Sequence, residues 1–506
     1  MSKTVFEKSQ CGQNAYSLPK DDDEFKKHLP EKELLRKLDI PLPELSEIDL
    51  TRHFTLMASR NVGIDNQFYP LGSCTMKLNP RVNEWCAALP GFTHTHPFAP
   101  EESVQGNLQV IFELIQILCR VCGMTAGSLL PNAGAQGEFT GVKMIAAYHL
   151  KRGDKNRNEM LIPDNAHGTN SATAAMAAFK IISVRTNEKG DMDLEHLKEV
   201  VSERTAGLML TNPNTLGLFS GVVTEIAEIV HEKGGLLYYD GANLNAILNV
   251  VRPGDMGFDV MHINLHKTFS TPHGGGGPGS GPIFCNEKLK EFLPVPRVEK
   301  VNEAFQIVWN DPMSIGKIAT FHGNFAIYLR AYLYAKLHGH YGLRRIAEIA
   351  VLNANYLKKK LENLMTIPFP QSCMHEFVIQ ADTFMDKGVR ALDIAKRLLD
   401  YGVYAPTIYF PLIIKECMLI EPTESESKGT LDKFIEIFES IINEIKTNPE
   451  LVKTAPHTKP VSRLDELYAA KNPIFKHATH KVESCFVEKL SESPSHVLGS
   501  SAPFNS

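Results

Sequence analysis

Short apolar runs and amphipathic stretches alternate through the middle of the chain. The apolar runs are predicted to be strands: Met160–Ile162, Lys180–Arg185, Leu208–Thr211, Leu236–Asp240 and Asp259–Leu265. The stretches with helical spacing are Asn107–Val121, Phe139–Leu150, Asp193–Val201 and Thr224–Lys233. Repeated strand–helix units predict an α/β fold with a mostly parallel sheet, in which ligands bind at the carboxyl ends of the strands.

The pattern changes after about Phe321. Long helical stretches lead there into a smaller α+β unit, and the helices predicted in this region are Asn324–Leu337, Arg344–Leu364, Ala391–Tyr401 and Thr430–Ile445. At the other end of the chain, the first residues are polar and broken by prolines, and they contain no convincing βαβ unit. They are predicted to form an arm that packs against a partner.

These changes of pattern predict four parts. They are an N-terminal arm (1–75), a large domain (76–325), a smaller α+β C-terminal domain (326–450) and a C-terminal extension (451–506). The end of the extension, Val482–Ser506, is serine-rich and mostly polar, so it is predicted to be disordered.

The composition excludes several classes of protein. Of the 506 residues, 43% are hydrophobic and 22% are charged, which is typical of a globular protein. A net charge of −5 and the lack of a basic cluster argue against nucleic-acid binding. No run of about 18 apolar residues predicts a membrane span, and the N-terminus lacks the apolar core of a signal peptide. Nine cysteines at irregular spacings are typical of reduced thiols, so a cytoplasmic protein is expected.

No metal site is predicted. Cys119-x-x-Cys122 lies in an apolar helical stretch and has no second cysteine pair, so core packing is expected for it. His94-x-His96 has no obvious third ligand.

The candidate chemistry lies at two strand ends. Lys267 follows the last predicted strand and precedes the glycine-rich loop Gly274–Gly281, whose backbone can approach a ligand closely. A lysine in this position suits a Schiff base with an aldehyde cofactor. Asp240 ends the preceding strand, one crossover connection away, where it would hold a pyridine nitrogen protonated. The pair predicts pyridoxal phosphate as an electron sink.

The same glycine-rich loop also satisfies G-x-G-x-x-G, from Gly274 to Gly279. In a dinucleotide-binding fold that motif follows a strand and opens a helix. Here it runs through Pro278 into the strand-like Ile283–Cys285, so a loop that passes beside a cofactor is the preferred interpretation.

The best phosphate site begins at Gly134, where Ala135 and Gln136 lead into the helical stretch Phe139–Leu150. Small residues at a helix start leave backbone amides accessible, and the helix dipole favours an anion there. The alternative is an ordinary turn from a loop into a helix.

Two further polar residues, His167 and Asn212, directly follow predicted strands. Because the carboxyl ends of parallel strands meet at one edge of a sheet, both are expected to lie near Asp240 and Lys267. A structural, hydrogen-bonded role is the alternative for the histidine.

The segment Asn264–Phe269, together with Gly274–Gly279, resembles the cofactor-lysine segment of the glycine dehydrogenase (decarboxylating) family, the P-protein of the glycine cleavage system. The resemblance extends from about Val5 to Lys471 and includes Tyr69–Pro80. The length and the N-terminal sequence are similar to the second subunit of the two-chain form of this family. Residues beyond Lys471 depart from it.

The resemblance implies a fold type I, aminotransferase-like enzyme that carries pyridoxal 5'-phosphate on Lys267. It also implies that Asp240 contacts the pyridine nitrogen, that His167 stacks on the ring and that Asn212 bonds the ring hydroxyl. The implied phosphate contacts are Gly134, Ala135, Gln136 and Thr268.

The implied reaction is the decarboxylation of glycine, after which the remaining aminomethyl group passes to the lipoyl arm of the H-protein. The implied partners are subunit 1, with two copies of each subunit, the lipoylated H-protein, and the T-protein and L-protein of the same system. An aminotransferase or another amino-acid decarboxylase would share the Asp240–Lys267 pair. A non-catalytic scaffold subunit and a binding module for lipoylated proteins are the alternatives outside enzyme chemistry.

Overall fold

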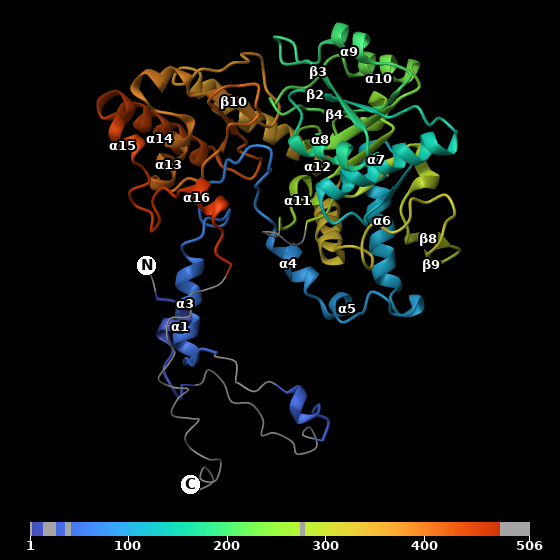
Figure 1. The fold of residues 1–506 in the computed structure, drawn as a ribbon, viewed down its shortest axis with the longest axis horizontal. Coiled ribbons are helices and arrows are strands. Elements are labelled where there is room, and N and C mark those ends of the chain that lie inside the picture. The colour runs from blue at the N-terminus through green and yellow to red at the C-terminus, as the bar shows by residue number, and fades with distance from the viewer. Residues whose placement is uncertain (1–2, 14–26, 36–41, 274–278, 476–506) are drawn as a thin grey trace. The chain divides into compact units, whose positions relative to one another are not determined.

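A computed structural model of the chain describes residues 3–13, 27–35, 42–273 and 279–475. The chain divides into two compact units, one made of Met1–Val62 and Pro460–Ser506, the other of Gly63–Lys459. The helices described in the first unit are α1 (Val5–Lys8), η1 (Lys32–Leu34), α3 (Glu47–Ala58) and α16 (Glu466–Lys471). All of the predicted site residues lie in the second unit, whose elements are labelled in Figure 1.

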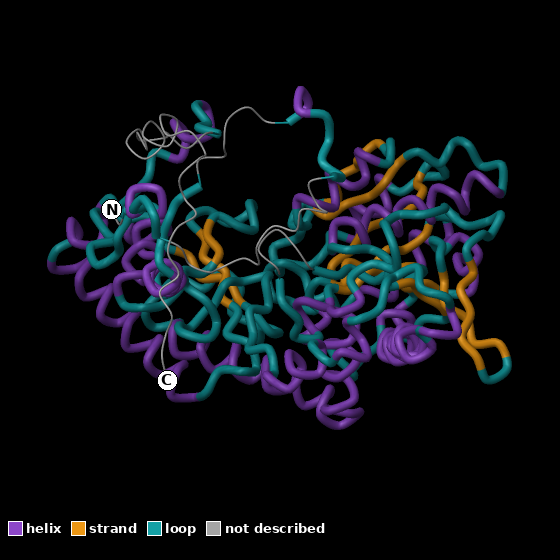
Figure 2. The backbone as a smooth tube through the Cα atoms, turned by 90° about the horizontal axis from the view of Figure 1, so that it is seen from below, coloured by secondary structure: helices purple, strands orange, loops and turns teal. Residues whose placement is uncertain are grey.

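The second unit is built on a seven-stranded sheet with the order β1-β7-β6-β5-β4-β2-β3. The strands β6, β5, β4, β2 and β3 are parallel, while β7 runs antiparallel to both of its neighbours. They are orange in Figure 2, and their bounds are β1 Ala126–Ser128, β2 Glu159–Pro163, β3 Lys180–Val184, β4 Thr205–Thr211, β5 Leu236–Gly241, β6 Val260–Ile263 and β7 Ile283–Cys285. The predicted α/β fold with a mostly parallel sheet is confirmed.

The four helical stretches predicted in this region are confirmed as α6 (Gln105–Cys122), α7 (Gly134–Lys151), α9 (Leu194–Val200) and α10 (Val223–Glu232). Two helices were not predicted, α8 (Gly168–Met176) and the short α11 (Leu265–Thr268). Asp193 caps α9 by accepting the N–H groups of Glu195 and His196 at 3.1 Å each, which satisfies two free donors of the first turn. Short 3₁₀ turns lie at η2 (Glu101–Ser103), η3 (Leu244–Ala246), η4 (Pro253–Met256) and η5 (Glu287–Phe292).

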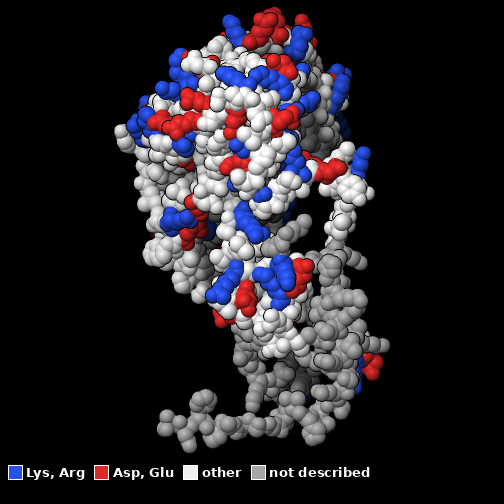
Figure 3. Space-filling view, turned by 90° about the vertical axis from the view of Figure 1, so that its left-hand side faces the viewer, with Lys and Arg blue, Asp and Glu red and all other residues white. Residues whose placement is uncertain are grey.

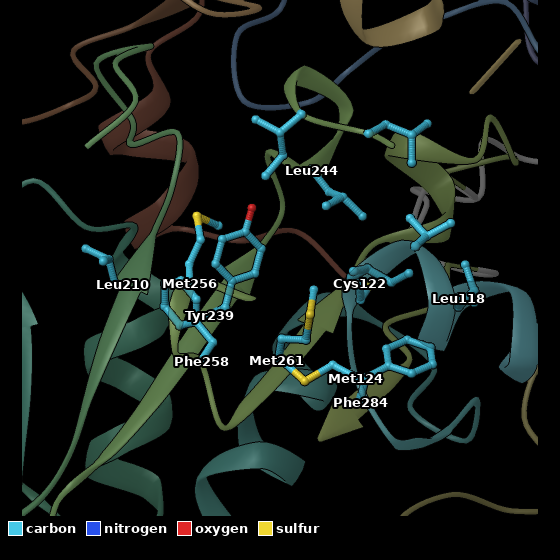
Figure 4. Packing of buried hydrophobic residues seen from close by; sticks show 14 of the residues in the cluster. Leu118, Cys122, Met124, Leu210, Tyr239, Leu244, Met256, Phe258, Met261 and Phe284 are labelled. Carbon is cyan, nitrogen blue, oxygen red and sulfur yellow. The ribbon is translucent and has the colours of Figure 1, made fainter. Parts of the chain in front are cut away.

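The main hydrophobic core contains the predicted cysteine motif. Cys122 is fully buried near Leu118 and Met124, as Figure 4 shows. Burial raises the pKa of Cys119 to about 12 and that of Cys122 well above its usual value. Since a thiolate is the reactive and metal-binding form, these thiols are packing residues, which confirms the interpretation made from the sequence.

The small domain begins within a long helix. α12 (Phe325–Leu361) contains a non-helical residue, Gly339, at φ 57°, between the two helical stretches predicted there. A three-stranded antiparallel sheet with the order β10-β12-β11 follows. The remaining bounds are β10 Phe377–Gln380, η6 Asp382–Lys387, α13 Ala391–Asp400, β11 Thr407–Ile408, β12 Cys417–Ile420, α14 Lys428–Thr447 and α15 Pro449–Lys453.

The segment from Gly63 to Lys77 is part of the second unit and packs against the small domain. Phe68 lies in the core of the small domain, Leu71 bridges to Ile420, and the Gly72 N–H donates to the Leu419 carbonyl at 3.2 Å. A Cβ on Gly72 would lie 2.3 Å from Leu419 Cγ, so only glycine fits this close approach. Two short helices follow, α4 (Arg81–Ala87) and α5 (Pro90–Thr93).

One hairpin was not predicted, β8 (Arg297–Val301) with β9 (Ala304–Val308) (Figure 1). Lysine, arginine and carboxylate side chains are intermixed over the face of the molecule drawn in Figure 3, so that face carries no broad basic surface of the kind that nucleic acids bind. Among the residues that the structure describes, no helix has both the length and the apolarity needed to cross a membrane.

Candidate active site

A cavity of about 220 Å³ lies at the carboxyl ends of β2, β4, β5 and β6. Five of the predicted site residues line it: Gly134, Ala135, His167, Asp240 and Lys267. The rule that parallel strands present their carboxyl ends along one edge therefore brings together residues far apart in the chain. Other residues of its wall were not predicted, namely Ser73, Glu138, Thr169, Thr211, Thr215, Ala242, Asn243, His262, Asn264 and His266.

Three predicted residues lie outside the cavity wall. Asn212 is fully buried, and its Oδ1 accepts the Ser220 N–H at 2.9 Å, while its Nδ2 has no partner. The Gln136 side chain accepts the Asn132 N–H and donates to the Ile318 carbonyl. Thr268 is buried with its hydroxyl unpartnered.

Lys267 projects from the short helix α11, directly after β6. Backbone bonds hold this turn, with the Lys267 N–H donating to the Asn264 carbonyl at 3.0 Å and the Leu265 N–H to the Ser280 carbonyl at 3.2 Å. Ser280 follows residues 274–278 of the predicted glycine-rich loop, which lie outside the described residues. The chain then enters β7 and not a helix, so a dinucleotide fingerprint is excluded.

A buried lysine, Lys77, ties the Lys267 turn to the small domain. Its Nζ donates to the Thr268 carbonyl at 2.8 Å, to Glu424 at 2.7 Å, to Asn245 at 2.9 Å and to the Tyr334 hydroxyl at 3.2 Å. These residues form the Lys77 junction. Burial lowers the pKa of Lys77, and the Glu424 carboxylate opposes that shift. Because the ammonium's hydrogen bonds lead to four different segments, its position depends on the packing of both domains.

Replacing Lys77 by methionine should lower the free energy of unfolding by about 3–5 kcal/mol, because it leaves the partly buried Glu424 carboxylate without its cation. Urea denaturation measures the effect. The double variant Lys77→Met/Glu424→Gln removes both charges and should recover part of the loss. Equal destabilisation of the single and double variants would contradict the assignment of the cost to an unpaired carboxylate.

Asp240 lies at the end of β5 and is almost fully buried. Its carboxylate accepts the Ala242 N–H at 3.0 Å and the Asn170 amide at 3.1 Å, and lies 3.5 Å from His262 Nε2. Burial opposes its ionisation, but His262 and these hydrogen bonds outweigh it and lower its pKa. The site therefore holds a carboxylate fixed in position at the bottom of the cavity.

His167 precedes α8 and caps it through its imidazole. Its Nδ1 accepts the Thr169 N–H at 3.2 Å, and the ring lies edge-on to Phe410 at 5.5 Å. Burial lowers the pKa of His167, as does the charge of Lys267, while Asp240 opposes the shift. The imidazole is therefore a neutral ring on the cavity wall.

Two family models match most of the second unit. The family model "Glycine cleavage system P-protein" matches residues 16–302, and "Glycine dehydrogenase, C-terminal domain" matches residues 346–460. A probable glycine dehydrogenase (decarboxylating) subunit 2 from Caldanaerobacter subterraneus is 55% identical over 93% of this chain and 98% of its own. One with the same name from Pyrococcus furiosus is 54% identical over 93% of this chain and 94% of its own. The chain belongs to the glycine cleavage system P-protein family.

Solved structures agree with this P-protein fold. An inhibitor-bound glycine decarboxylase (P-protein) of the glycine cleavage system matches with a TM-score of 0.69 at 20% identity, over 83% of this chain and 95% of that one. A glutamate decarboxylase from Lactobacillus brevis matches with a TM-score of 0.62 at 13% identity, over 82% of this chain and 96% of that one. The P-protein chain therefore has the fold of pyridoxal phosphate enzymes of fold type I.

The cavity of this P-protein chain fits pyridoxal phosphate. α7 begins at Gly134 without a side-chain cap, so its first N–H groups remain for an anion. A Cβ on Gly134 would lie 2.6 Å from Asn264 Oδ1, which is itself a buried atom without a partner. The Thr211 and Thr268 hydroxyls are likewise buried without partners. Unpartnered buried polar atoms are costly, and a polar ligand in the cavity would satisfy atoms of this kind.

One group of side chains in the P-protein chain has the donor atoms of a metal site. His375, Glu376 and Glu421 are fully buried, with ligand atoms within 4.8 Å of one another. The carboxylates accept backbone N–H groups, Glu376 that of Ser73 at 2.7 Å and Glu421 that of Thr75 at 2.9 Å. Burial raises the pKa of Glu421 to about 7 and that of Glu376 well above its usual value. Protonation of either carboxyl lowers the repulsion between the two, whereas both ring nitrogens of His375 are buried without a hydrogen-bond partner among the described residues.

Proposed function

We propose that the chain decarboxylates glycine with pyridoxal 5'-phosphate and passes the remaining aminomethyl group to the lipoyl arm of an H-protein. The observation that carries the proposal is the meeting of Lys267 and Asp240 in one cavity at adjacent strand ends. Membership of the P-protein family supplies the substrate, and the names of the relatives supply the reaction.

Each residue has a stated task in this proposal. Lys267 would hold the aldehyde carbon of the cofactor, and the Asp240 carboxylate would keep the pyridine nitrogen protonated. When bound, the cofactor supplies a ring that accepts the electron pair left by departing carbon dioxide. His167 would cover one face of that ring, and the first turn of α7, with Gly134, Ala135 and the Gln136 N–H, would hold the phosphate. Asn212 would bond the ring hydroxyl of the cofactor, and Thr268 would bond its phosphate. Both contacts require these side chains to turn toward the cavity.

The glycine carboxylate has no arginine partner among the described residues of the cavity wall. A decarboxylase has a physical reason to lack one. An ion pair would stabilise the carboxylate of the bound substrate, whereas its charge leaves in the transition state, so tight binding would raise the barrier. Neutral polar groups and backbone amides are the proposed contacts, with a correspondingly high KM.

The two arginines of the small domain that precede its last strands are not expected to bind substrate. Arg397 donates to Glu444 at 2.8 and 2.9 Å and to Asp400 at 3.0 Å, whereas Arg390 is exposed. Arg397→Ala and Arg390→Ala should each change kcat/KM for glycine by less than about tenfold, roughly 1.4 kcal/mol. Only Arg397→Ala should lower the thermal midpoint, because it leaves two carboxylates without a cation. A thousandfold loss of kcat/KM at either position, with the fold intact, would reveal a substrate clamp.

The proposed partners are a subunit 1, with two copies of each subunit, and the H-, T- and L-proteins of the glycine cleavage system. The relatives named subunit 2 support a second subunit. A cytoplasmic location is proposed because Cys119, Cys122 and Cys285 are buried free thiols.

The function is tested by co-expressing the chain with a candidate subunit 1 and measuring the release of carbon dioxide from glycine labelled in its carboxyl group. Release that requires pyridoxal phosphate and rises with a lipoylated protein supports the proposal. Transamination of amino acids without any lipoyl acceptor would instead identify an aminotransferase. If no cofactor binds, one of the two alternatives outside enzyme chemistry holds, the scaffold subunit or the binding module for lipoylated proteins.

A further inference from the structure

Glu138 is a buried carboxyl group in the wall of the cavity, one turn into α7. The described hydrogen bonds of its two oxygens go to three residues of the first turns of α8. Its Oε1 contacts the Thr169 hydroxyl at 2.8 Å, and its Oε2 contacts the Asn170 amide at 3.1 Å and the Thr173 hydroxyl at 3.3 Å. Its exposed fraction is 4%. A carboxyl group in this environment is either ionised, which places a charge in the interior, or protonated and neutral.

The hydrogen atoms in this contact chain can be counted. His167 Nδ1 accepts the Thr169 N–H at 3.2 Å, so Nδ1 carries no hydrogen of its own. The 2.9 Å contact between Nδ1 and the Thr169 hydroxyl oxygen must then use the hydroxyl hydrogen. That hydroxyl has only one hydrogen, so the 2.8 Å contact between Thr169 and Glu138 needs a hydrogen from Glu138. With Glu138 ionised, Nδ1 would instead donate to the hydroxyl and the 3.2 Å contact with the Thr169 N–H would be lost. All three contacts are therefore kept only when the Glu138 carboxyl is protonated and the N–H and the hydroxyl share the Nδ1 lone pair.

Asn170 connects Glu138 to Asp240. Its Nδ2 donates at 3.1 Å to Glu138 Oε2 and at 3.1 Å to Asp240 Oδ2, so one amide group joins the two carboxyl groups. Two negative charges sharing one buried donor would repel each other. Burial and the Asp240 charge accordingly raise the pKa of Glu138 to about 7. The charge in this part of the cavity therefore belongs to Asp240 and the proton to Glu138.

We propose that Glu138 is a positioning residue that carries a proton, holds His167 as the neutral tautomer with its hydrogen on Nε2, and links that ring to Asp240 through Asn170. Glu138 acts through these residues and not on the substrate. The proposal deepens the proposed function and rests on it for the roles of His167 and Asp240. A neutral imidazole over a protonated pyridine ring avoids placing two like charges face to face.

The titration of Glu138 occurs among several ionisable groups. Asp240 and Tyr238 of β5 interact electrostatically with Glu138, and His262 of β6 and His167 at the start of α8 line the same cavity. The charge of Lys267 also reaches Asp240, His167 and His262. When pH rises through the raised pKa, Glu138 loses its proton and the Thr169 hydroxyl turns toward the new carboxylate. His167 Nδ1 then loses that donor, so its environment changes with pH.

The test follows the His167 ring nitrogens in the full chain, loaded with pyridoxal phosphate and labelled with ¹⁵N-histidine. The signal is assigned by its loss in His167→Asn. At about pH 6 we expect Nδ1 without hydrogen and Nε2 with hydrogen, and a shift of the Nδ1 signal as pH passes about 7. Glu138→Gln offers an amide hydrogen in place of the acid hydrogen, so the low-pH signal should persist across the whole range.

Three further variants, compared with Glu138→Gln, distinguish a role of the Glu138–Thr169–His167 hydrogen bonds from a merely structural role. Glu138→Ala and Thr169→Val should both displace the Nδ1 signal at every pH, whereas Glu138→Gln and Thr169→Ser should restore it. A hydrogen on Nδ1 at pH 6 would overturn the proposal. The same pH profile in the wild-type chain and in Glu138→Gln would also overturn it. If pyridoxal phosphate does not bind, the proposed function fails, while the same nitrogen signals in the unloaded chain still decide whether Glu138 carries the proton.

Discussion

Replacement of Lys267 by alanine is expected to abolish turnover of glycine and the visible absorbance of lysine-bound pyridoxal phosphate. Alanine has no amine to bond the cofactor's aldehyde carbon, and Lys267 is the only lysine among the described residues of the cavity wall. The fold should survive because backbone hydrogen bonds and the Lys77–Thr268 contact hold the α11 turn, not the Lys267 side chain. Absorption spectra and the unfolding midpoint measure the two effects.

Lys267→Arg is the matched control. It keeps a cation on the same turn but cannot form the carbon–nitrogen double bond, so it should also be inactive. Near-normal decarboxylation by the alanine variant would mean that another residue holds the cofactor. Activity of the arginine variant would show that Lys267 contributes only its charge.

Replacement of Asp240 by asparagine is expected to leave the cofactor bound but to lower kcat severely. Asparagine has the same size as aspartate, and its Oδ1 can still accept the Ala242 N–H, so the shape of the cavity is preserved, although its Nδ2 cannot accept from the Asn170 amide. A neutral amide no longer keeps the pyridine nitrogen protonated, and the ring then accepts the electron pair less well. Cofactor content and kcat are measured on the same sample. A fall in kcat of less than about tenfold, roughly 1.4 kcal/mol, would contradict this role.

Asp259→Asn controls for the loss of a buried carboxylate in the same sheet. Asp259 precedes β6 at the opposite end from Lys267, and its carboxylate accepts from His231 at 2.7 Å and from the Leu237 N–H at 2.8 Å. This variant should lower stability, because Asp259 has a lowered pKa in the folded chain. It should leave the kcat for glycine close to that of the wild-type chain. The comparison distinguishes chemistry at Asp240 from general loss of a buried charge.

The sequence predicted the central sheet because its strands are continuous apolar runs, which fully buried parallel strands require. Every residue of β4 and β5 is buried, as such runs imply. β1 was missed because Ala126, Gly127 and Ser128 have no strand propensity, and their pairing with β7 defines the strand. The β8–β9 hairpin was missed because it is mostly exposed and its charged residues hide the alternation.

The site was predictable where it depends on strand ends and not where it depends on distant side chains. Asp240 lies at the carboxyl end of β5 and Lys267 in the turn after β6, so topology alone brings them together. Thr211, not Asn212, lines the cavity, because the chain turns into buried surroundings one residue after β4 ends. Lys77 and its partner Glu424 are 347 positions apart, and no local pattern reveals that both are buried together. Glu138 was not predicted as a site residue, because no local pattern shows that its carboxyl group is buried in the cavity wall.

The Lys77 junction couples the turn that carries Lys267 to the small domain. The visible absorbance of a cofactor held by Lys267 is therefore expected to respond to movement of that domain. The Thr268 carbonyl, next to the residue proposed to hold the cofactor, shares one ammonium group with Glu424 of the small domain and Tyr334 of α12. A movement of the small domain that displaces Glu424 is expected to shift Lys77, and through its bond to the Thr268 carbonyl also the turn that carries Lys267. The visible spectrum should therefore change in mild denaturant before the sheet unfolds, and an optical titration would read the domain's motion without an added label.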